Sequence, residues 1–100
     1  MKVRFTENHI RFRISKNEIQ LLSEEKKISL NLLVGDSILE ITVLATDSLC
    51  CLLYENTKIS LYLPTHRIDE LKIKNQLSFN HQNLQKSNSV TVISVEIDKW

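Results

Sequence analysis

One pattern of strands and a helix occurs twice along this chain, and it constrains the fold more than any other feature. The strand-like residues 10–14 precede one predicted helix, and residues 59–63, which lie 49 positions further along, precede another. The same offset carries turns, strands and helices through the whole chain without a gap, so that residues 41–44 fall on residues 90–93. A fixed period of this kind indicates an internal repeat. We therefore interpret the chain as two divergent copies of one unit, over residues of about 1–48 and 49–100.

The first predicted hairpin is defined by strict alternation of apolar and basic residues. Alternation with a period of two is typical of a strand with one buried face. A short polar segment, residues 6–9, separates the two alternating runs and predicts a turn. The apolar set is Val3, Phe5, Ile10, Phe12 and Ile14, and the basic set is Lys2, Arg4, Arg11 and Arg13.

Each copy continues into a short helix. Ser15 and Glu18 have the spacing of a capping box, in which each side chain satisfies a backbone N–H of the other residue, so we expect a helix at about 15–26. In the second copy, Pro64 ends a strand and suits the first turn of a helix, where its missing N–H has no cost.

Six further strands are expected. The run 49–54 is apolar on both faces, which predicts a central position in a sheet. Gly35 and Asp36 form a turn signal, and the polar residues 81–89 predict a loop. The expected strands are residues 28–34, 38–45, 49–54, 59–63, 76–80 and 90–97.

These elements define an α+β protein of one domain, residues 1–100, built mainly from antiparallel strands. A single ββαββ unit cannot bury both its sheet and its helix, but two copies related by a pseudo-twofold axis can. We expect a curled eight-stranded sheet or barrel with two helices, because closure also removes exposed strand edges.

Composition and charge exclude several classes of protein. A net charge of +1 gives no global basic excess to attract nucleic acid, so only local charge placement can do so. The N-terminus has no apolar core of a signal peptide, and the longest apolar run is too short to cross a bilayer. Cys50 and Cys51 are adjacent, which places them on opposite faces of a strand and disfavours a disulfide. We expect a cytoplasmic protein without a membrane partner.

The basic set is the strongest candidate site. Lys2, Arg4, Arg11 and Arg13 are expected on the same outward face of the first hairpin, where four like charges repel one another. A bound phosphate or acidic partner would relieve that repulsion, which gives an anion-binding surface. The alternatives are a solvated face, or pairing with acidic residues of the chain itself, for which the candidates are Glu24, Glu25 and Glu40.

The second copy does not repeat this charge. The counterparts of Arg4, Arg11 and Arg13 are Leu53, Ser60 and Tyr62. The weakly polar patch of Cys51, Leu53 and Tyr62 is either covered by a helix or forms an interface with another molecule.

Other chemistry has little support in the sequence. The three histidines, His9, His66 and His81, fall in a turn, a helix and a loop without metal-ligand spacing. Both cysteines lie in an apolar run, and a single glycine cannot build a phosphate-binding loop. We expect no catalytic residue, metal or cofactor, while Trp100 is either exposed or packed back on the core.

The chain also resembles a known family. Residues 1–5, residues 8–19, residues 54–64 and, more loosely, residues 95–100 resemble short bacterial proteins described only as a domain of unknown function. The resemblance implies that the arginines of the second strand are shared by the fold, and it implies a bacterial cytoplasmic setting. It brings no activity with it.

Three functions follow as expectations. The first is a non-enzymatic binding or interaction module that associates with itself as a homodimer or with another protein. The second is a binder of an anion or a nucleic acid through the basic set. The third is a small enzyme with a site between the two halves, which requires a cleft and a group of shifted pKa.

Overall fold

The computed structural model describes residues 1–82 and 90–98, and this part of the chain forms eight strands and two helices. The α+β class is confirmed, and the first helix and the strands begin and end within two residues of their expected bounds. The segment expected as a loop is shorter, since His81 and Gln82 continue a strand, and its remainder lies outside the described residues. The elements of the first half are β1 (Lys2–Phe5), β2 (His9–Ser15), α1 (Lys16–Glu25), β3 (Lys27–Val34) and β4 (Ser37–Thr46). Those of the second half are β5 (Cys51–Glu55), β6 (Lys58–Pro64), α2 (Thr65–Lys74), β7 (Gln76–Gln82) and β8 (Val90–Asp98).

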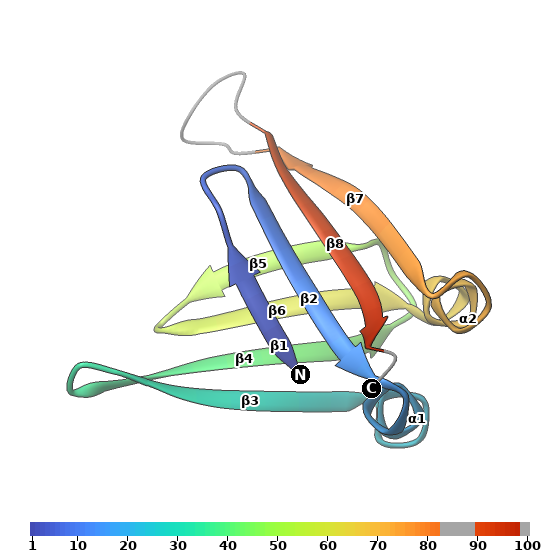
Figure 1. The fold of residues 1–100 in the computed structure, drawn as a ribbon, viewed down its shortest axis with the longest axis horizontal. Coiled ribbons are helices and arrows are strands. Elements are labelled where there is room, and N and C mark those ends of the chain that lie inside the picture. The colour runs from blue at the N-terminus through green and yellow to red at the C-terminus, as the bar shows by residue number, and fades with distance from the viewer. Residues whose placement is uncertain (83–89, 99–100) are drawn as a thin grey trace.

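The strands form two four-stranded sheets, and each sheet takes one hairpin from each half of the chain. The first sheet has the order β1-β2-β8-β7, and the second has the order β3-β4-β6-β5. The hairpins are antiparallel, whereas the central pairs β2–β8 and β4–β6 are parallel. Figure 1 shows strands of the first sheet crossing over those of the second, with both helices at one end.

The expected single curled sheet or barrel is therefore wrong. Because each half places its two hairpins in different sheets, the sheets pack against each other and neither closes on itself. Strands β1, β7, β3 and β5 remain as edges. The alternation of residues predicted the strands correctly, but it carried no information about which hairpins pair.

The core lies between the sheets and under the two helices. Its sheet residues are the inward members of the alternating runs, and each helix adds two residues of one face. Contacts of α1 and α2 with strands of both sheets close this end of the core. The buried apolar residues are Phe12, Ile14, Ile19, Leu22, Ile28, Ile41, Val43, Ile59, Leu61, Leu63, Ile68, Leu71, Leu77, Ile93, Val95 and Ile97.

The pairing pattern of the two halves agrees, except for a shift in the last strand. Lys27 pairs with Leu44, and Gln76, 49 residues after Lys27, pairs with Glu96, which lies 52 residues after Leu44. The gapless register is thus wrong by three residues in β8, where Ile93 and not Val90 occupies the place of Ile41. The cause is the connection between β7 and β8, since seven residues separate the paired Gln82 and Val90. Four residues separate the equivalent Leu33 and Ile38.

Strand β5 does not have the predicted central position. It is an edge strand that pairs only with β6 within the described residues. Leu53 and Tyr54 are 48% and 68% exposed, and Leu49 just before the strand is 83% exposed. Apolar residues on both faces predict a central strand only when both faces are covered, and here they are not.

The start of α1 confirms the capping box. The backbone N–H of Glu18 donates to Ser15 Oγ over 3.1 Å, and the backbone N–H of Ser15 donates to Glu18 Oε1 over 3.0 Å. In α2 the residue at the equivalent position is Pro64, whose side chain makes no capping hydrogen bond. The two helices therefore begin with different stabilisation.

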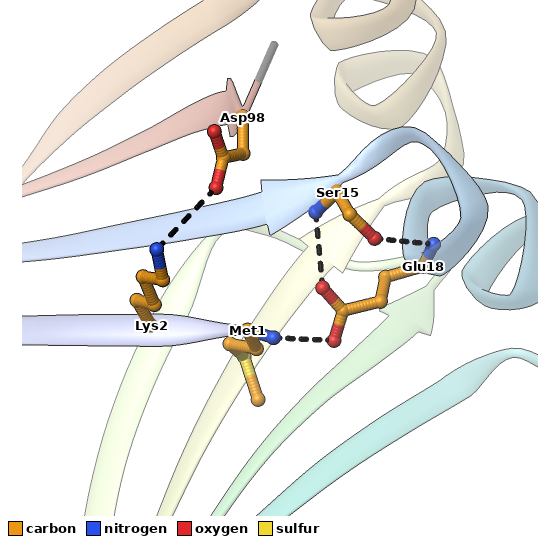
Figure 2. A network of polar contacts seen from close by, with 5 residues as sticks. All are labelled: Met1, Lys2, Ser15, Glu18 and Asp98. Atoms are coloured by element: carbon orange, nitrogen blue, oxygen red, sulfur yellow. Dashed lines mark hydrogen bonds and ion pairs between the residues drawn. The ribbon is translucent and has the colours of Figure 1, made fainter. Parts of the chain in front are cut away.

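Glu18 also anchors the chain terminus. The Met1 amino group donates to Glu18 Oε2 over 2.6 Å, and Figure 2 shows Glu18 between Met1 and Ser15. Partial burial raises the pKa of the Glu18 carboxyl, but the hydrogen bonds from the amino group and from Ser15 outweigh this and hold the pKa below its ordinary value.

Candidate functional site: a basic sheet face

The four predicted basic residues come together on the outward face of the first sheet. In the register of β1 and β2, Lys2 lies directly opposite Arg13, and Arg4 lies directly opposite Arg11. Together with Val3 they line a hollow of about 160 Å³, which we call the basic pocket. Two like-charged pairs opposite each other on adjacent strands destabilise a hairpin unless other charges compensate.

The compensating charges come from β8 and not from Glu24, Glu25 or Glu40, the partners considered from the sequence. Glu96 Oε1 lies 3.6 Å from Arg11 Nε, and Glu96 Oε2 lies 4.0 Å from Arg13 Nη2. Asp98 Oδ2 lies 3.9 Å from Lys2 Nζ, as Figure 2 shows. Three of the four cations are thus paired, but each of these contacts is too long for a hydrogen bond.

Two features leave this compensation incomplete. The Nε atom of Arg11 is buried and has no hydrogen-bond partner in the described part of the chain. Arg4 is exposed, and it forms no ion pair with any described residue. Two carboxylates therefore face four cations, and the pocket keeps a local positive charge on a protein of nearly zero net charge.

A larger cleft of about 410 Å³ lies beside the basic pocket and shares Arg11 with it. Strands β2, β8 and β7 form its floor, so residues of both halves meet there. His9 Nε2 lies 2.8 Å from Ser94 Oγ within this cleft. The lining residues are His9, Arg11, Lys74, Gln76, Leu77, Ser78, Val92, Ser94 and Glu96.

No local pattern in the sequence located this cleft. His9 was expected in a turn but begins β2, and 85 positions separate it from Ser94. Only the parallel pairing of β2 with β8 brings the two side chains together. Ser94 and Glu96 lie in β8, which was expected as a strand without any indication of its neighbours.

The groups with clearly shifted pKa values lie elsewhere. Arg67 Nη1 donates to Glu70 Oε2 over 2.6 Å, and Arg67 Nη2 donates to the Ser78 carbonyl oxygen over 3.2 Å. Partial burial lowers the pKa of Arg67, but Cys50 and Glu70 raise it more strongly. Desolvation raises the pKa of Glu70, but the charges and hydrogen bonds of Arg67 and Lys74 outweigh this and hold the pKa below its ordinary value. Glu18, Arg67 and Glu70 line neither the cleft nor the basic pocket.

The patch of Cys51, Leu53 and Tyr62 lies on the outward face of the second sheet. Cys51 is opposite Tyr62, and Leu53 is opposite Ser60. Leu53 is 48% exposed and borders a hollow of about 310 Å³ shared with Tyr62, so no helix covers this part of the patch. The remaining lining residues, Glu55, Asn56, Lys58 and Ser60, give this hollow mixed charge, in contrast to the basic pocket.

Among residues 1–82 and 90–98, no group of three or more His, Cys, Asp or Glu side chains is arranged to hold a metal ion. Cys50 and Cys51 are free thiols. Neither described helix has the length and apolar character needed to span a bilayer. Trp100 lies outside the described residues.

Fold and site together define a small α+β protein of two mixed four-stranded sheets, one of which has a basic outer face. The model of the Family of unknown function (DUF7009) matches residues 1–99, so the chain belongs to that family. This confirms the resemblance to a domain of unknown function. No curated protein matches the chain at a significant level.

Proposed function

We propose that this protein is a non-enzymatic binding module that holds an anionic group of its ligand in the basic pocket. The observation that carries the proposal is that Lys2, Arg4, Arg11 and Arg13 all line one hollow. A cytoplasmic setting in a bacterium is part of the proposal, supported by the free cysteines and the family resemblance.

The arrangement of donors favours a phosphate group. Guanidinium groups form charge-assisted, often paired, hydrogen bonds with phosphate oxygens. Arg4 is available to a ligand without breaking an ion pair of the described residues. The long contacts of Glu96 with Arg11 and Arg13 are weak competitors for such a ligand.

The adjoining cleft extends this site toward the rest of the ligand. Its hydroxyl, amide and imidazole groups are suited to hydrogen bonding, and Lys74 adds a further cation. The aromatic residues Phe5, Phe12 and Phe79 alternate with outward-facing residues and belong to the inner side of the first sheet. Base stacking on this face therefore has no support, and the expected contact with a nucleic acid is to its phosphates alone.

Calorimetric titration with inorganic pyrophosphate and with a short single-stranded oligonucleotide tests the proposal. We expect the double variant Arg11→Ala plus Arg13→Ala to weaken binding of the responding probe at least about tenfold, because hydrogen bonds to charged groups each contribute about 1.5–3 kcal/mol. Binding should also fall with added salt. The two probes distinguish a small phosphorylated ligand from a nucleic acid.

A matched control removes the same charge elsewhere. Lys16 and Lys72 are exposed helix residues that line neither hollow, so Lys16→Ala plus Lys72→Ala should leave binding unchanged. An equal loss in both double variants would mean that net charge and not the pocket controls binding. Absence of binding by either probe at low salt would contradict the proposal.

A further inference from the structure

Among the described residues, β3 is the longest edge strand. Its outer side has no neighbouring strand in that part of the chain. It spans Lys27–Val34 and pairs only with β4. Alternate residues of an antiparallel edge strand direct their N–H and C=O groups away from the partner strand. Residues 28–34 contain no charged side chain, so nothing on this stretch repels a further strand.

The hairpin tip of β3 and β4 exposes apolar side chains. Leu33 is 82% exposed, and Val34 and Ile38 are each 58% exposed. Strand β4 pairs with β6 only from Glu40 onward, so the tip is a two-stranded ribbon without a third strand. Figure 1 shows this hairpin projecting beyond β5 and β6. Such exposed apolar surface on a long edge is a typical site of intermolecular pairing.

The other edges have the protection that β3 lacks. β1 has four residues, of which Lys2 and Arg4 are charged, so a pair of β1 strands would bring cations together. β5 has five residues and ends in Glu55. β7 carries polar side chains at the positions where β3 carries Leu32 and Leu33, namely His81 and Gln82.

We propose that β3 pairs antiparallel with β3 of a second copy of this chain about a twofold axis, which joins the two second sheets into one continuous sheet. Such an isologous contact requires a surface complementary to itself. Pairing centred on Asn31, the middle of the uncharged stretch, places Leu30 of each copy opposite Leu32 of the other. Ser29 then lies opposite Leu33, and Lys27 lies opposite Gly35, so no like charges meet. The basic pocket is on the other sheet, and the inference does not rest on its function.

Sedimentation velocity over a range of concentrations tests the inference with Leu33→Lys as the disrupting variant. The wild-type protein should be dimeric at high concentration, and Leu33→Lys should raise the dissociation constant at least about tenfold, because it places a cation in each half of the contact. Leu33→Val, which keeps an uncharged strand-forming residue, should remain dimeric. Ile73→Lys is the matched control, because Ile73 of α2 is 80% exposed and lies on another element.

Hydrogen exchange then locates the contact. The amides of β3 that point away from β4 should exchange more slowly as the concentration rises, and this protection should vanish in Leu33→Lys. Cooperative thermal melting of Leu33→Lys and Ile73→Lys, at a concentration low enough for both to be monomeric, would show that both variants are folded. A wild-type protein that remains monomeric at high concentration overturns the inference, as does a dimer that Leu33→Lys does not weaken or that leaves β3 unprotected.

Discussion

The central strands β2 and β6 occupy equivalent positions in the two sheets, and they share an apolar inward side but differ in the chemistry of the outward side. Their inward residues, Phe12 and Ile14 in β2 and Leu61 and Leu63 in β6, are all fully buried. Their outward residues are Arg11 and Arg13 in β2 but Ser60 and Tyr62 in β6. Packing therefore fixes the inward side of this fold, whereas the outward side is free to acquire different chemistry in each half.

The N-terminal ends of α1 and α2 also occupy equivalent positions but carry different side chains. Glu18 of α1 and Arg67 of α2 lie 49 positions apart, and each forms a polar network with the surrounding strands. The α1 network includes a capping box, whereas Pro64 leaves α2 without a side-chain cap. Equivalent backbone positions are therefore stabilised by different side chains.

The largest loss of stability is expected from truncating a buried side chain on the inward side of either central strand. Phe12 in β2 and Leu61 in β6 occupy equivalent positions of the two halves. Replacing either residue by Ala leaves a cavity among fully buried side chains. We expect a loss of about 3–5 kcal/mol of unfolding free energy for Phe12→Ala and about 2–5 kcal/mol for Leu61→Ala. Urea unfolding followed by circular dichroism measures both. A loss below about 1 kcal/mol in either half would show that its sheet is not part of one common core.

A smaller loss of stability is expected from removing the carboxylate charge in either of the two helix networks. Glu18→Gln keeps an acceptor for the Ser15 backbone N–H but removes the charge paired with the Met1 amino group, at a cost of about 1 kcal/mol near neutral pH. Because the folded pKa of Glu18 lies below its ordinary 4.5, this stabilisation is complete above about pH 4.5 and is lost as the pH falls through the lowered pKa. Urea unfolding of both proteins over this pH range should show their difference disappearing.

The equivalent variant in the other half is Glu70→Gln. The pKa of Glu70 is also lowered, so its contribution has the same sign and is lost in the same direction of pH. Because Glu70 pairs with Arg67 and Lys74 of its own helix, three and four positions away, we expect a smaller difference from the wild-type protein than for Glu18→Gln. A larger loss of unfolding free energy in Glu70→Gln than in Glu18→Gln would show that the α2 network contributes more to stability than the α1 network.

The smallest expected effect concerns the basic pocket itself. Lys2→Ala removes a side chain that is 77% exposed and lies 3.9 Å from Asp98, so the unfolding free energy should change by less than about 0.5 kcal/mol. Thermal melting of the variant beside the wild-type protein provides the measurement. A loss above about 1 kcal/mol would mean that the outward charges of the first sheet stabilise the fold.

The sequence predicted the elements of this fold because their signals are local. Alternation located β1 and β2, and Ser15 with Glu18 located the start of α1. Alternation also placed all four basic residues on one face, and the structure places them around one hollow. These features depend on residues at most a few positions apart.

The remaining features depend on pairing between distant strands, for which the sequence has no local signal. The parallel contact of β2 with β8 determines the choice of sheet, the charges of Glu96 and Asp98 beside the basic set, and the His9–Ser94 contact. The longer connection before β8 displaced the repeat register by three residues, and an odd shift also exchanges the inward and outward sides of that strand.

The exchange of hairpins between the halves has a consequence for synthesis on the ribosome. All four strands of the second sheet are present once the chain has been made as far as Pro64, whereas β2 waits for its parallel neighbour until Val90–Asp98 emerges. Until then, Arg11 and Arg13 have no Glu96 beside them, and one side of β2 is open. The basic face is thus the last part of the nascent protein to be completed, after the second sheet has had the time to form.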